Sequence, residues 1–316
     1  GVYGVGAAAP LKDWGGEYGT QYGEAPQTTV VVINELLAPL LVGEDVRRIE
    51  HLHAKMDKLV KGYPYAKAAL DVAMHDAIGK IYNVPAYQLL GGLVRREIPI
   101  AHSIGLMETE DALREAQEAV DEGIATIKIK VGIDPERDVD IVKRMRQTLG
   151  PRVRLRVDAN QGYRSWKEAL GVIRRMEEYD ICYMEQPVEG LEGMARVAQA
   201  TDVPIMADES AWTAHDVLRL AEWKAAEMIS CYYTKPGGLM KAKKLLAVAE
   251  TVGMRCDING SAEMGVGNAA NLHLAASTLI IDLPGTIPVT STAEVVRTRI
   301  AGHRYLDDII KEPFLY

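Results

Sequence analysis

Four short polar motifs along this chain each close an apolar, strand-like run. The first carries the paired lysines Lys128 and Lys130, and the next three carry the acids Asp158, Glu185 and Asp208. In a strand alternate side chains share a face, so Lys128 and Lys130 point the same way. Three acids at neighbouring strand ends would raise one another's pKa values by repulsion unless a cation lay between them. A hard divalent ion, above all Mg²⁺, resolves that conflict, so the motifs predict a metal-assisted proton-transfer site.

The runs that carry these motifs belong to a regular alternation of elements. From about residue 98 onward, short apolar runs alternate with amphipathic stretches of helical length, as in parallel strands joined by crossover helices. In a closed (β/α) barrel the functional groups gather where the strands finish, because the loops there converge over one mouth. We predict eight strands, at Ile98–Ser103, Ile124–Lys130, Val153–Asp158, Cys182–Glu185, Pro204–Asp208, Met228–Tyr233, Arg255–Asn259 and Ile280–Leu283.

The first part of the chain has a different pattern. Thr28–Leu41 and Tyr65–Tyr82 are apolar at helical spacing with no strand between them, and a helix end and turn precede the barrel. A chain of 316 residues that is 48% hydrophobic can bury a large core in one barrel with an appendage. We expect a cap domain over residues 1–97, a barrel over 98–300, and the start of a C-terminal cap segment over 301–316.

Composition argues against several classes of partner. The formal net charge of −8, with no run of Lys or Arg, opposes binding to nucleic acid. No apolar stretch approaches the roughly 20 residues that a membrane span needs, and the first residues lack the regions of a signal peptide. We therefore expect a cytoplasmic protein that binds neither nucleic acid nor membrane. Cys182, Cys231 and Cys256 lack the spacing of a zinc or redox site and are expected to be small buried hydrophobes.

Together, these motifs resemble those of the enolase superfamily, in its muconate lactonising enzyme / mandelate racemase branch. Their order and spacing agree with that family, and the resemblance covers nearly the whole chain. The matching segments in the barrel are Lys128-x-Lys130, Asp158-Ala-Asn160, Glu185-Gln-Pro187, Asp208-Glu-Ser210 and Gly237-Gly238. Those in the cap are Tyr65-Ala-Lys-Ala-Ala-Leu-Asp-Val-Ala-Met-His-Asp76 and Leu89-Leu-Gly-Gly92.

The resemblance implies an α/β fold in which an α+β cap domain covers a modified TIM barrel. It implies that Mg²⁺ is held by one acid from each of three motifs, and that Lys130 removes the proton α to the carboxylate of a small substrate. Lys128 would neutralise the substrate carboxylate and depress the pKa of Lys130. Asn160 and Glu209 would support the site through hydrogen bonds. Relatives of this kind also make a homo-oligomer the expectation.

The sixth strand departs from the family pattern. Counting back from Gly237-Gly238, the family's second lysine falls at Tyr232, three residues before Lys235. Positions three apart point to opposite faces of a regular strand, so Lys235 cannot replace that lysine without a bulge or a turn of the backbone. We expect Tyr232 to face the substrate, with Lys235 as a cation in the loop or behind it. A phenol with a pKa near 10 is a poor base at neutral pH but a good hydrogen-bond donor.

Other departures lie at the ends of the pattern. The chain opens at what resembles the last strand of the cap's sheet, with Ala7 where the family often has Glu, and it closes before the usual C-terminal cap segment. We therefore expect the first cap strands to be missing from this sequence. After the seventh strand, three polar residues could either line the pocket or cap their own loop, namely Asn259, Ser261 and Glu263.

These observations favour one function and leave others open. With Tyr232 opposite Lys130, chemistry on one face of the substrate, such as the lactonisation of a muconate cycloisomerase or a β-elimination, is favoured over racemisation by two bases. An acid-sugar dehydratase and an amino-acid racemase or epimerase of the same superfamily are the alternatives. From another class, a Schiff-base aldolase could use Lys128 or Lys130 as its nucleophile. A barrel that binds a metabolite without catalysis is the last alternative.

Overall fold

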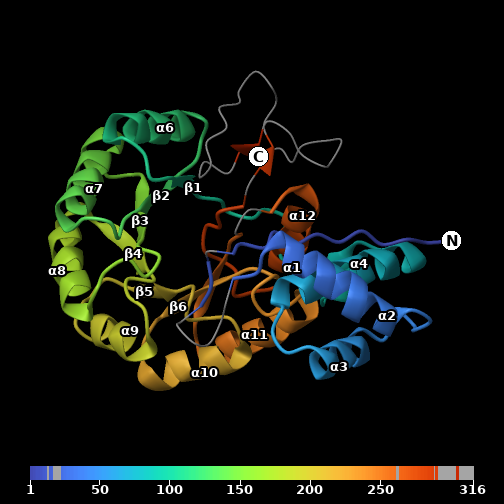
Figure 1. Cartoon of the computed structure of the whole chain (residues 1–316). Helices are drawn as coiled ribbons and strands as arrows, with labels where there is room; N and C mark the ends of the chain where they lie inside the picture. Colours follow the sequence, from blue (N-terminus) through green and yellow to red (C-terminus); the bar gives the residue numbers. More distant parts are fainter. Residues whose placement is uncertain (13, 17–22, 261–262, 288, 291–303, 306–316) are drawn as a thin grey trace.

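Seven parallel strands form one curled sheet at the centre of the protein. The computed structural model describes residues 1–12, 14–16, 23–260, 263–287, 289–290 and 304–305. The strands follow one another in chain order around the sheet, with helices on the outside (Figure 1). They are β1 (His102–Ile104), β2 (Thr126–Lys130), β3 (Arg154–Asp158), β4 (Ile181–Glu185), β5 (Ile205–Ala207), β6 (Met228–Cys231) and β7 (Arg255–Ile258). A separate parallel pair joins β8 (Val289–Thr290) and β9 (Arg304–Tyr305).

The segment 281–285 closes the barrel. Parallel bridges join Ile281 to Cys256 of β7 and Gly285 to Ile100, just before β1. The segment therefore occupies the eighth place between β7 and β1, where the sequence predicts the last strand. It forms no regular strand, because Pro284 has no N–H to donate to a neighbour. The chain at residues 99–101 is hydrogen-bonded to Gly285, and β1 begins only at His102, later than predicted.

Amphipathic helices cover the outside of the barrel, as the sequence predicts. Side chains cap several of them: Asp134 accepts a hydrogen bond from the Arg137 N–H, and Thr213 forms a capping box with Asp216. The apolar faces pack on the strands and share one large core with them. The helices are α6 (Thr109–Asp121), α7 (Pro135–Leu149), α8 (Trp166–Met176) with the 3₁₀ turn η2 (Glu177–Tyr179), α9 (Leu191–Ala198), α10 (Ala214–Trp223), α11 (Leu239–Thr251) and α12 (Gly265–Ala276).

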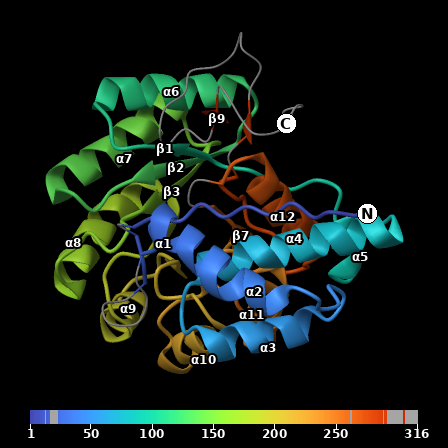
Figure 2. The same ribbon diagram turned by 45° about the vertical axis from the view of Figure 1, so that its right-hand side comes forward.

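The cap consists of helices. One nearly continuous helical stretch runs through α1 (Pro26–Val31), a π-helical turn η1 (Val32–Leu37) and α2 (Ala38–Leu41). It packs with the longer helices over a small core that includes Leu37, Leu52 and Met56, and α4 lies beside α11 and α12 (Figure 2). The remaining cap helices are α3 (Ile49–Leu59), α4 (Pro64–Tyr82) and α5 (Ala86–Leu89). No described helix is both long and apolar enough to cross a membrane.

No strand is assigned among the described residues of 1–97. The first residues, which resemble a cap strand in sequence, run instead along α4. A Cβ atom on Gly4 or Gly6 would lie 1.9 Å from a backbone oxygen of α4, so glycine permits this close approach. A strand needs a neighbouring strand for its backbone hydrogen bonds, and the described part of the cap provides none.

Asp71 on α4 connects the cap to the barrel. Its carboxylate accepts a hydrogen bond from the backbone N–H of Leu239, the first residue of α11, at 2.7 Å. It also pairs with His53 Nε2 at 2.7 Å and His75 Nδ1 at 3.1 Å. Burial opposes the charge of Asp71, yet these two imidazoles lower the pKa of its carboxyl group. Gly238 has a φ of +128°, and a Cβ there would lie 2.4 Å from Asp71 side-chain atoms.

The barrel interior holds an apolar layer below a charged one. Tyr183, Met206, Met228 and Leu283 form the apolar cluster. Tyr183 and Glu185 point inward, so the alternate residue Cys182 points outward and is exposed. The prediction that Cys182 is buried is therefore wrong, whereas Cys231 and Cys256 are buried as expected.

Candidate active site

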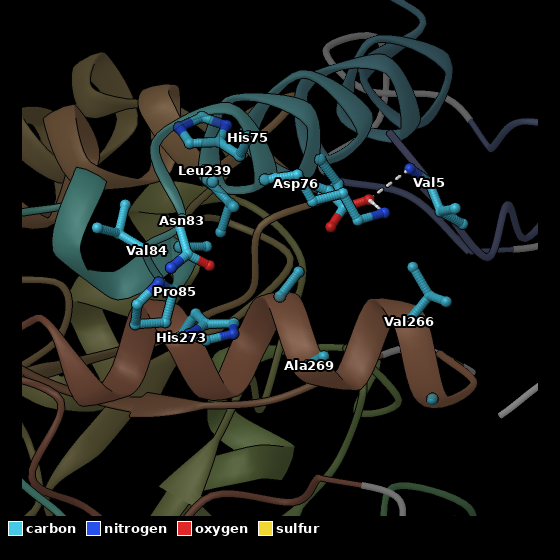
Figure 3. A pocket seen from close by; sticks show the side chains of 16 residues that line it. Val5, His75, Asp76, Asn83, Val84, Pro85, Leu239, Val266, Ala269 and His273 are labelled. Atoms are coloured by element: carbon cyan, nitrogen blue, oxygen red, sulfur yellow. Dashed lines mark hydrogen bonds and ion pairs between the residues drawn. The ribbon is translucent and has the colours of Figure 1, made fainter. Parts of the chain in front are cut away.

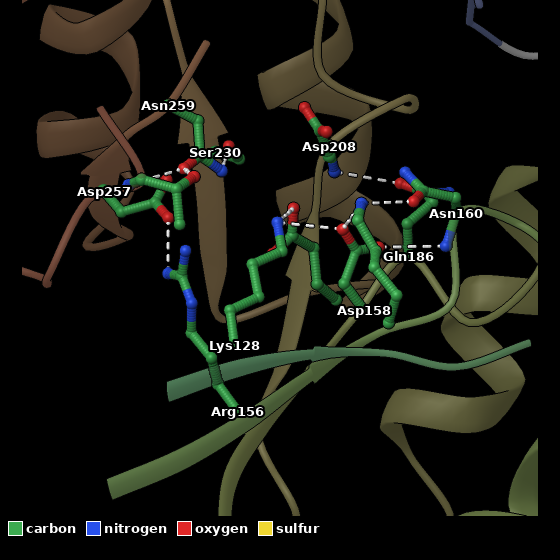
Figure 4. Close-up of polar contacts among 12 residues, drawn as sticks. Lys128, Arg156, Asp158, Asn160, Gln186, Asp208, Ser230, Asp257 and Asn259 are labelled. Atoms are coloured by element: carbon green, nitrogen blue, oxygen red, sulfur yellow. Dashed lines mark hydrogen bonds and ion pairs between the residues drawn. The ribbon is translucent and has the colours of Figure 1, made fainter. Parts of the chain in front are cut away.

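The predicted lysine and acids converge at the carboxyl ends of the strands. Lys130, Asp158 and Glu185 are the last residues of β2, β3 and β4, and Asp208 directly follows β5. The strand register pairs Lys130 with Asp158, and Asp158 with Glu185, so these three side chains start at one level. Figure 4 shows Lys128 reaching toward Asp158, with Gln186 and Asp208 on the far side of Asp158. Alternation along parallel strands thus brings together the residues that the sequence predicts.

Lys128 lies between two of the acids. Its Nζ is 2.8 Å from Asp158 Oδ2 and 2.8 Å from Glu185 Oε1, and all three side chains are buried. Burial works against its ammonium group, but the two carboxylates outweigh burial and raise the pKa of Lys128. Burial also opposes the charge of Asp158, yet Lys128 and Lys130 lower the pKa of that carboxyl group. Lys128 therefore supplies a fixed positive charge inside the barrel.

Lys130 reaches the mouth. Its Nζ is 2.6 Å from Asp158 Oδ2 and donates a hydrogen bond to Asn160 Oδ1 at 2.5 Å. The side chain of Lys130 is 25% exposed, against 5% for Lys128. Of the two lysines, Lys130 is accordingly the one that a molecule at the mouth can contact.

Asn160 and Glu209 form a hydrogen-bonded pair next to Lys130. Asn160 Nδ2 donates to Glu209 Oε1 at 3.0 Å, and the backbone N–H of Asn160 donates to Asp158 Oδ1 at 2.9 Å. Burial, together with the charges of Asp208 and Asp158, raises the pKa of the Glu209 carboxyl group. The pair lies where the sequence places residues that support the site.

Gln186 holds the loop that carries Asp208. Its Oε1 accepts hydrogen bonds from the backbone N–H groups of Asp208 at 2.9 Å and Ser210 at 3.2 Å. Its Nε2 donates to the Ser210 hydroxyl at 2.8 Å. The sequence interpretation gives Gln186 no role. Its position directly after Glu185, at the end of β4, is the signal that could have drawn attention to it.

Lys235 is buried and fully hydrogen-bonded. Its Nζ donates to Asp208 Oδ1 at 2.6 Å, to the Asp208 carbonyl at 2.9 Å and to the Ser230 carbonyl at 2.7 Å. These three acceptors use all three hydrogens of the ammonium group, and the side chain is 0% exposed. The turn at residues 233–237 brings Lys235 back toward the barrel. Lys235 thus ties β6 to the Asp208 loop.

Tyr232 occupies the end of β6. It directly follows the last residue of that strand, is 2% exposed, and has the Lys235 ammonium 4.7 Å from its ring centroid. Burial, followed by the neighbouring charge of Asp208, raises the pKa of the Tyr232 phenol well above its usual value. The phenol therefore keeps its proton at any physiological pH.

An aromatic cluster packs around Tyr232. Its ring centroid lies 5.7 Å from that of Trp14, which in turn lies 5.1 Å from that of Trp212. Tyr65 of α4 meets Trp212 edge-on at 6.5 Å. Cap and barrel residues thus share this side of the mouth. The sequence offers no local signal for the cluster, because its members come from four distant segments.

The residues after β7 have separate roles. Asn259 donates to the Ser230 hydroxyl at 2.7 Å and accepts from the Thr286 backbone N–H at 2.9 Å, so it joins β6 to the closing segment. Glu263 is buried and accepts a hydrogen bond from the Thr234 hydroxyl at 3.4 Å. Ser261 lies outside the described residues.

The three acids suit a hard divalent ion by their chemistry. In the described part of the chain, no three or more His, Cys, Asp or Glu side chains are arranged closely enough to hold a metal, since the lysine ammonium groups stand among the acids. Yet Glu185 Oε2 is buried and has no hydrogen-bond partner among the described residues. Burial and the charge of Asp158 raise the pKa of Glu185, a conflict that a cation would relieve. The all-oxygen donor set fits Mg²⁺.

A cleft lies between α4 and α12, away from these residues. It has a volume of about 710 Å³, and Figure 3 shows His75 and Asp76 of α4 across from His273 of α12. None of the residues that the sequence predicts for the site lines it. The polar residues of the barrel mouth thus form one centre, distinct from this seam between cap and barrel.

Comparison with known proteins matches both parts of the chain. Residues 2–91 match the model of the mandelate racemase / muconate lactonizing enzyme N-terminal domain, and residues 111–294 match the model described as enolase C-terminal domain-like. The first match covers most of the cap, and the second covers most of the barrel.

Individual relatives have different activities. The chain is 33% identical to an N-succinyl-L-Arg/Lys racemase of Bacillus cereus, over 85% of this chain and 74% of that protein. It is 32% identical to muconate cycloisomerase 1 of Rhodococcus opacus, over 96% of this chain and 80% of that protein. A crystal structure of a dipeptide epimerase from Enterococcus faecalis, complexed with Mg and the dipeptide L-Leu-L-Tyr, has a TM-score of 0.79 and 36% identity, covering 83% of this chain and 74% of that one.

Proposed function

The chain belongs to the mandelate racemase / muconate lactonizing enzyme family of the enolase superfamily, and from that premise we propose that it removes the proton α to the carboxylate of a small organic acid in a Mg²⁺-dependent reaction. The observation that carries this proposal is the partly exposed side chain of Lys130, at a mouth where three acids lie at or directly after the ends of successive strands. The named relatives are racemases, epimerases and cycloisomerases, which are all isomerases.

Each residue has a role that follows from its position. Asp158, Glu185 and Asp208 would hold Mg²⁺, and the ion, when bound, supplies positive charge that stabilises an enediolate. Lys130 takes the α-proton, because its amine is the one that reaches the mouth. Lys128 stays charged and lowers the electrostatic cost of negative charge nearby. Without such stabilisation the α-proton of a carboxylate is far too weak an acid for a lysine.

Tyr232 supports chemistry on one face of the substrate. In the closed barrel β2 and β6 are separated by three strands in one direction and by β7, the closing segment and β1 in the other, so they lie on opposite sides. A base on β6 would allow racemisation by two bases. However, Tyr232 keeps its proton, and Lys235 is fully buried with all three of its hydrogens already donated. We therefore favour lactonisation or β-elimination, in which the phenol donates a hydrogen bond.

Racemisation or epimerisation is the second candidate, because several relatives carry those names. The two candidates make different predictions for solvent exchange. Muconates, acid sugars and amino-acid derivatives should be incubated in D₂O with Mg²⁺, and deuterium at the α-carbon followed by NMR. Exchange that EDTA abolishes supports the proposal, and exchange into both enantiomers supports racemisation. A covalent adduct on Lys128 or Lys130 after borohydride treatment with a carbonyl compound would point instead to a Schiff-base aldolase.

A further inference from the structure

A hydrogen-bonded chain runs from Lys130 to a buried acid on a different loop. Lys130 Nζ donates to Asn160 Oδ1, and Asn160 Nδ2 donates to Glu209 Oε1 at 3.0 Å. The three residues come from the end of β2, the loop after β3 and the loop after β5. Glu209 is 1% exposed, so its contact with Asn160 lies inside the protein.

These hydrogen bonds require one particular orientation of the Asn160 side-chain amide. An amide has an acceptor oxygen at one end and an NH₂ donor at the other, and only the oxygen can accept from an ammonium group. A carboxyl oxygen on Glu209 faces the NH₂ end, which leaves the oxygen end for Lys130. A flipped amide would place donor against donor at Lys130 and acceptor against acceptor at Glu209. The backbone of Asn160 is held in the left-handed region, with φ of +42°, and its N–H is bound by Asp158.

Burying the Glu209 carboxyl group costs free energy. Its Oε2 is buried and has no hydrogen-bond partner in the described part of the chain. A buried polar atom without a partner costs free energy, typically about 1–3 kcal/mol. The hydrogen bond that Glu209 Oε1 accepts from the Asn160 NH₂ group is therefore the contact that argues for a role of this buried side chain as an acceptor.

We propose that Glu209 is a positioning residue that orients the Asn160 amide, and through it the amine of Lys130, toward the substrate at the mouth. The inference rests on the proposed function for its effect on rate, whereas the amide orientation itself is independent of any activity. Glu209 acts on the reaction only through Asn160 and does not contact the reacting atoms.

The test is a pair of Glu209 variants together with Asn160→Leu. Glu209→Leu removes the acceptor and should lower kcat for α-proton exchange by about 10- to 100-fold with KM nearly unchanged. Glu209→Gln can still turn an oxygen toward Asn160 and should keep most of the activity. In an Asn160→Leu background, Glu209→Leu should cost little more, because its target is gone. Losses that multiply in the double variant would overturn the proposal.

Two measurements separate this role from others. Calorimetry should show unchanged Mg²⁺ affinity in Glu209→Leu, and a tenfold weaker affinity would make Glu209 part of the metal site instead. A crystal structure of metal-free Glu209→Leu should show Lys130 without its Asn160 contact. An intact contact there would refute the positioning role even if the protein exchanged no substrate proton. Absence of exchange by the unaltered protein would count against the proposed function alone.

Discussion

The lysine side chains on the two sides of the barrel mouth have opposite environments. On the β2 side, Lys130 keeps a quarter of its side chain exposed and contacts Asp158 and Asn160. On the β6 side, Lys235 is wholly buried, and three acceptors use all of its hydrogens. Residue type alone therefore does not identify a base. Exposure and unused hydrogen-bonding capacity distinguish a lysine that can exchange protons from one that holds loops together.

The largest effect is expected from replacing Lys130 on the β2 side. Lys130→Met should reduce α-proton exchange by about 10²- to 10⁴-fold, because general-base catalysis of this kind contributes that much. Its melting temperature should stay close to that of the unaltered protein, since the side chain is partly exposed. Deuterium incorporation and thermal melting provide the two measurements. Exchange within tenfold of the original rate would remove Lys130 as the base.

The matched change on the other side should affect the fold. Lys235→Met leaves Asp208 without its buried partner, and breaking such a pair costs about 3–5 kcal/mol. We expect a lower free energy of unfolding in urea, in contrast to Lys130→Met. If Lys235→Met were as stable as the original and lost only proton exchange, the two lysines would not differ in the way described.

A smaller effect is expected from replacing Tyr232 at the end of β6, where a second base would stand. The unaltered protein should exchange deuterium into one enantiomer of a racemisable substrate, because Tyr232 cannot serve as a second base at neutral pH. Tyr232→Lys should introduce slow racemisation, measurable by chiral chromatography, while Tyr232→Phe should not. Equal exchange into both enantiomers by the unaltered protein would contradict the one-base interpretation.

The smallest effect concerns the cap, where neither lysine takes part. Burial opposes the charge of His75, but Asp71 raises its pKa. Its stabilising contribution is full below the unfolded pKa of about 6.5 and is lost as pH rises through the higher folded value. The lowered pKa of Asp71 works in the other direction, with its contribution lost as pH falls below the ordinary aspartate value of about 3.9.

His75→Gln should therefore flatten the decline in stability above pH 6.5 and cost on the order of 1–3 kcal/mol below it. Urea unfolding at several pH values measures this. His51→Gln, which changes an exposed histidine on α3, is the control and should leave the pH profile unchanged. An unaltered decline in His75→Gln would exclude His75 as its source.

Sequence reasoning could place residues within strands but not beyond them. Alternation and parallel order are enough to bring Lys130, Asp158 and Glu185 together, because these residues lie within their strands, and Asp208 directly follows β5. β6 ends at Cys231, and the turn that follows sends Lys235 where a strand would not. The prediction that Lys235 needs a turn of the backbone to approach the barrel is consistent with this geometry.

The rest depends on contacts between distant segments. Asn259 forms hydrogen bonds with Ser230 and Thr286, and the aromatic cluster joins Trp14 to Tyr232, directly after β6, and to Trp212, in the loop after β5. No local sequence pattern predicts contacts between such distant segments. The eighth strand was predicted in the right place, but its regularity was not, because Pro284 interrupts the backbone hydrogen bonds.

The contact of Asp71 with Gly238 and Leu239 has a consequence for how such proteins recombine. The carboxylate fills the space that any side chain at 238 would need and satisfies the first free N–H of α11. A chimera that combines this barrel with the cap of a relative must therefore inherit the acid and the glycine as a unit. Domain shuffling across this boundary is limited to caps that present a carboxylate at the same point, even where the rest of the interface tolerates exchange.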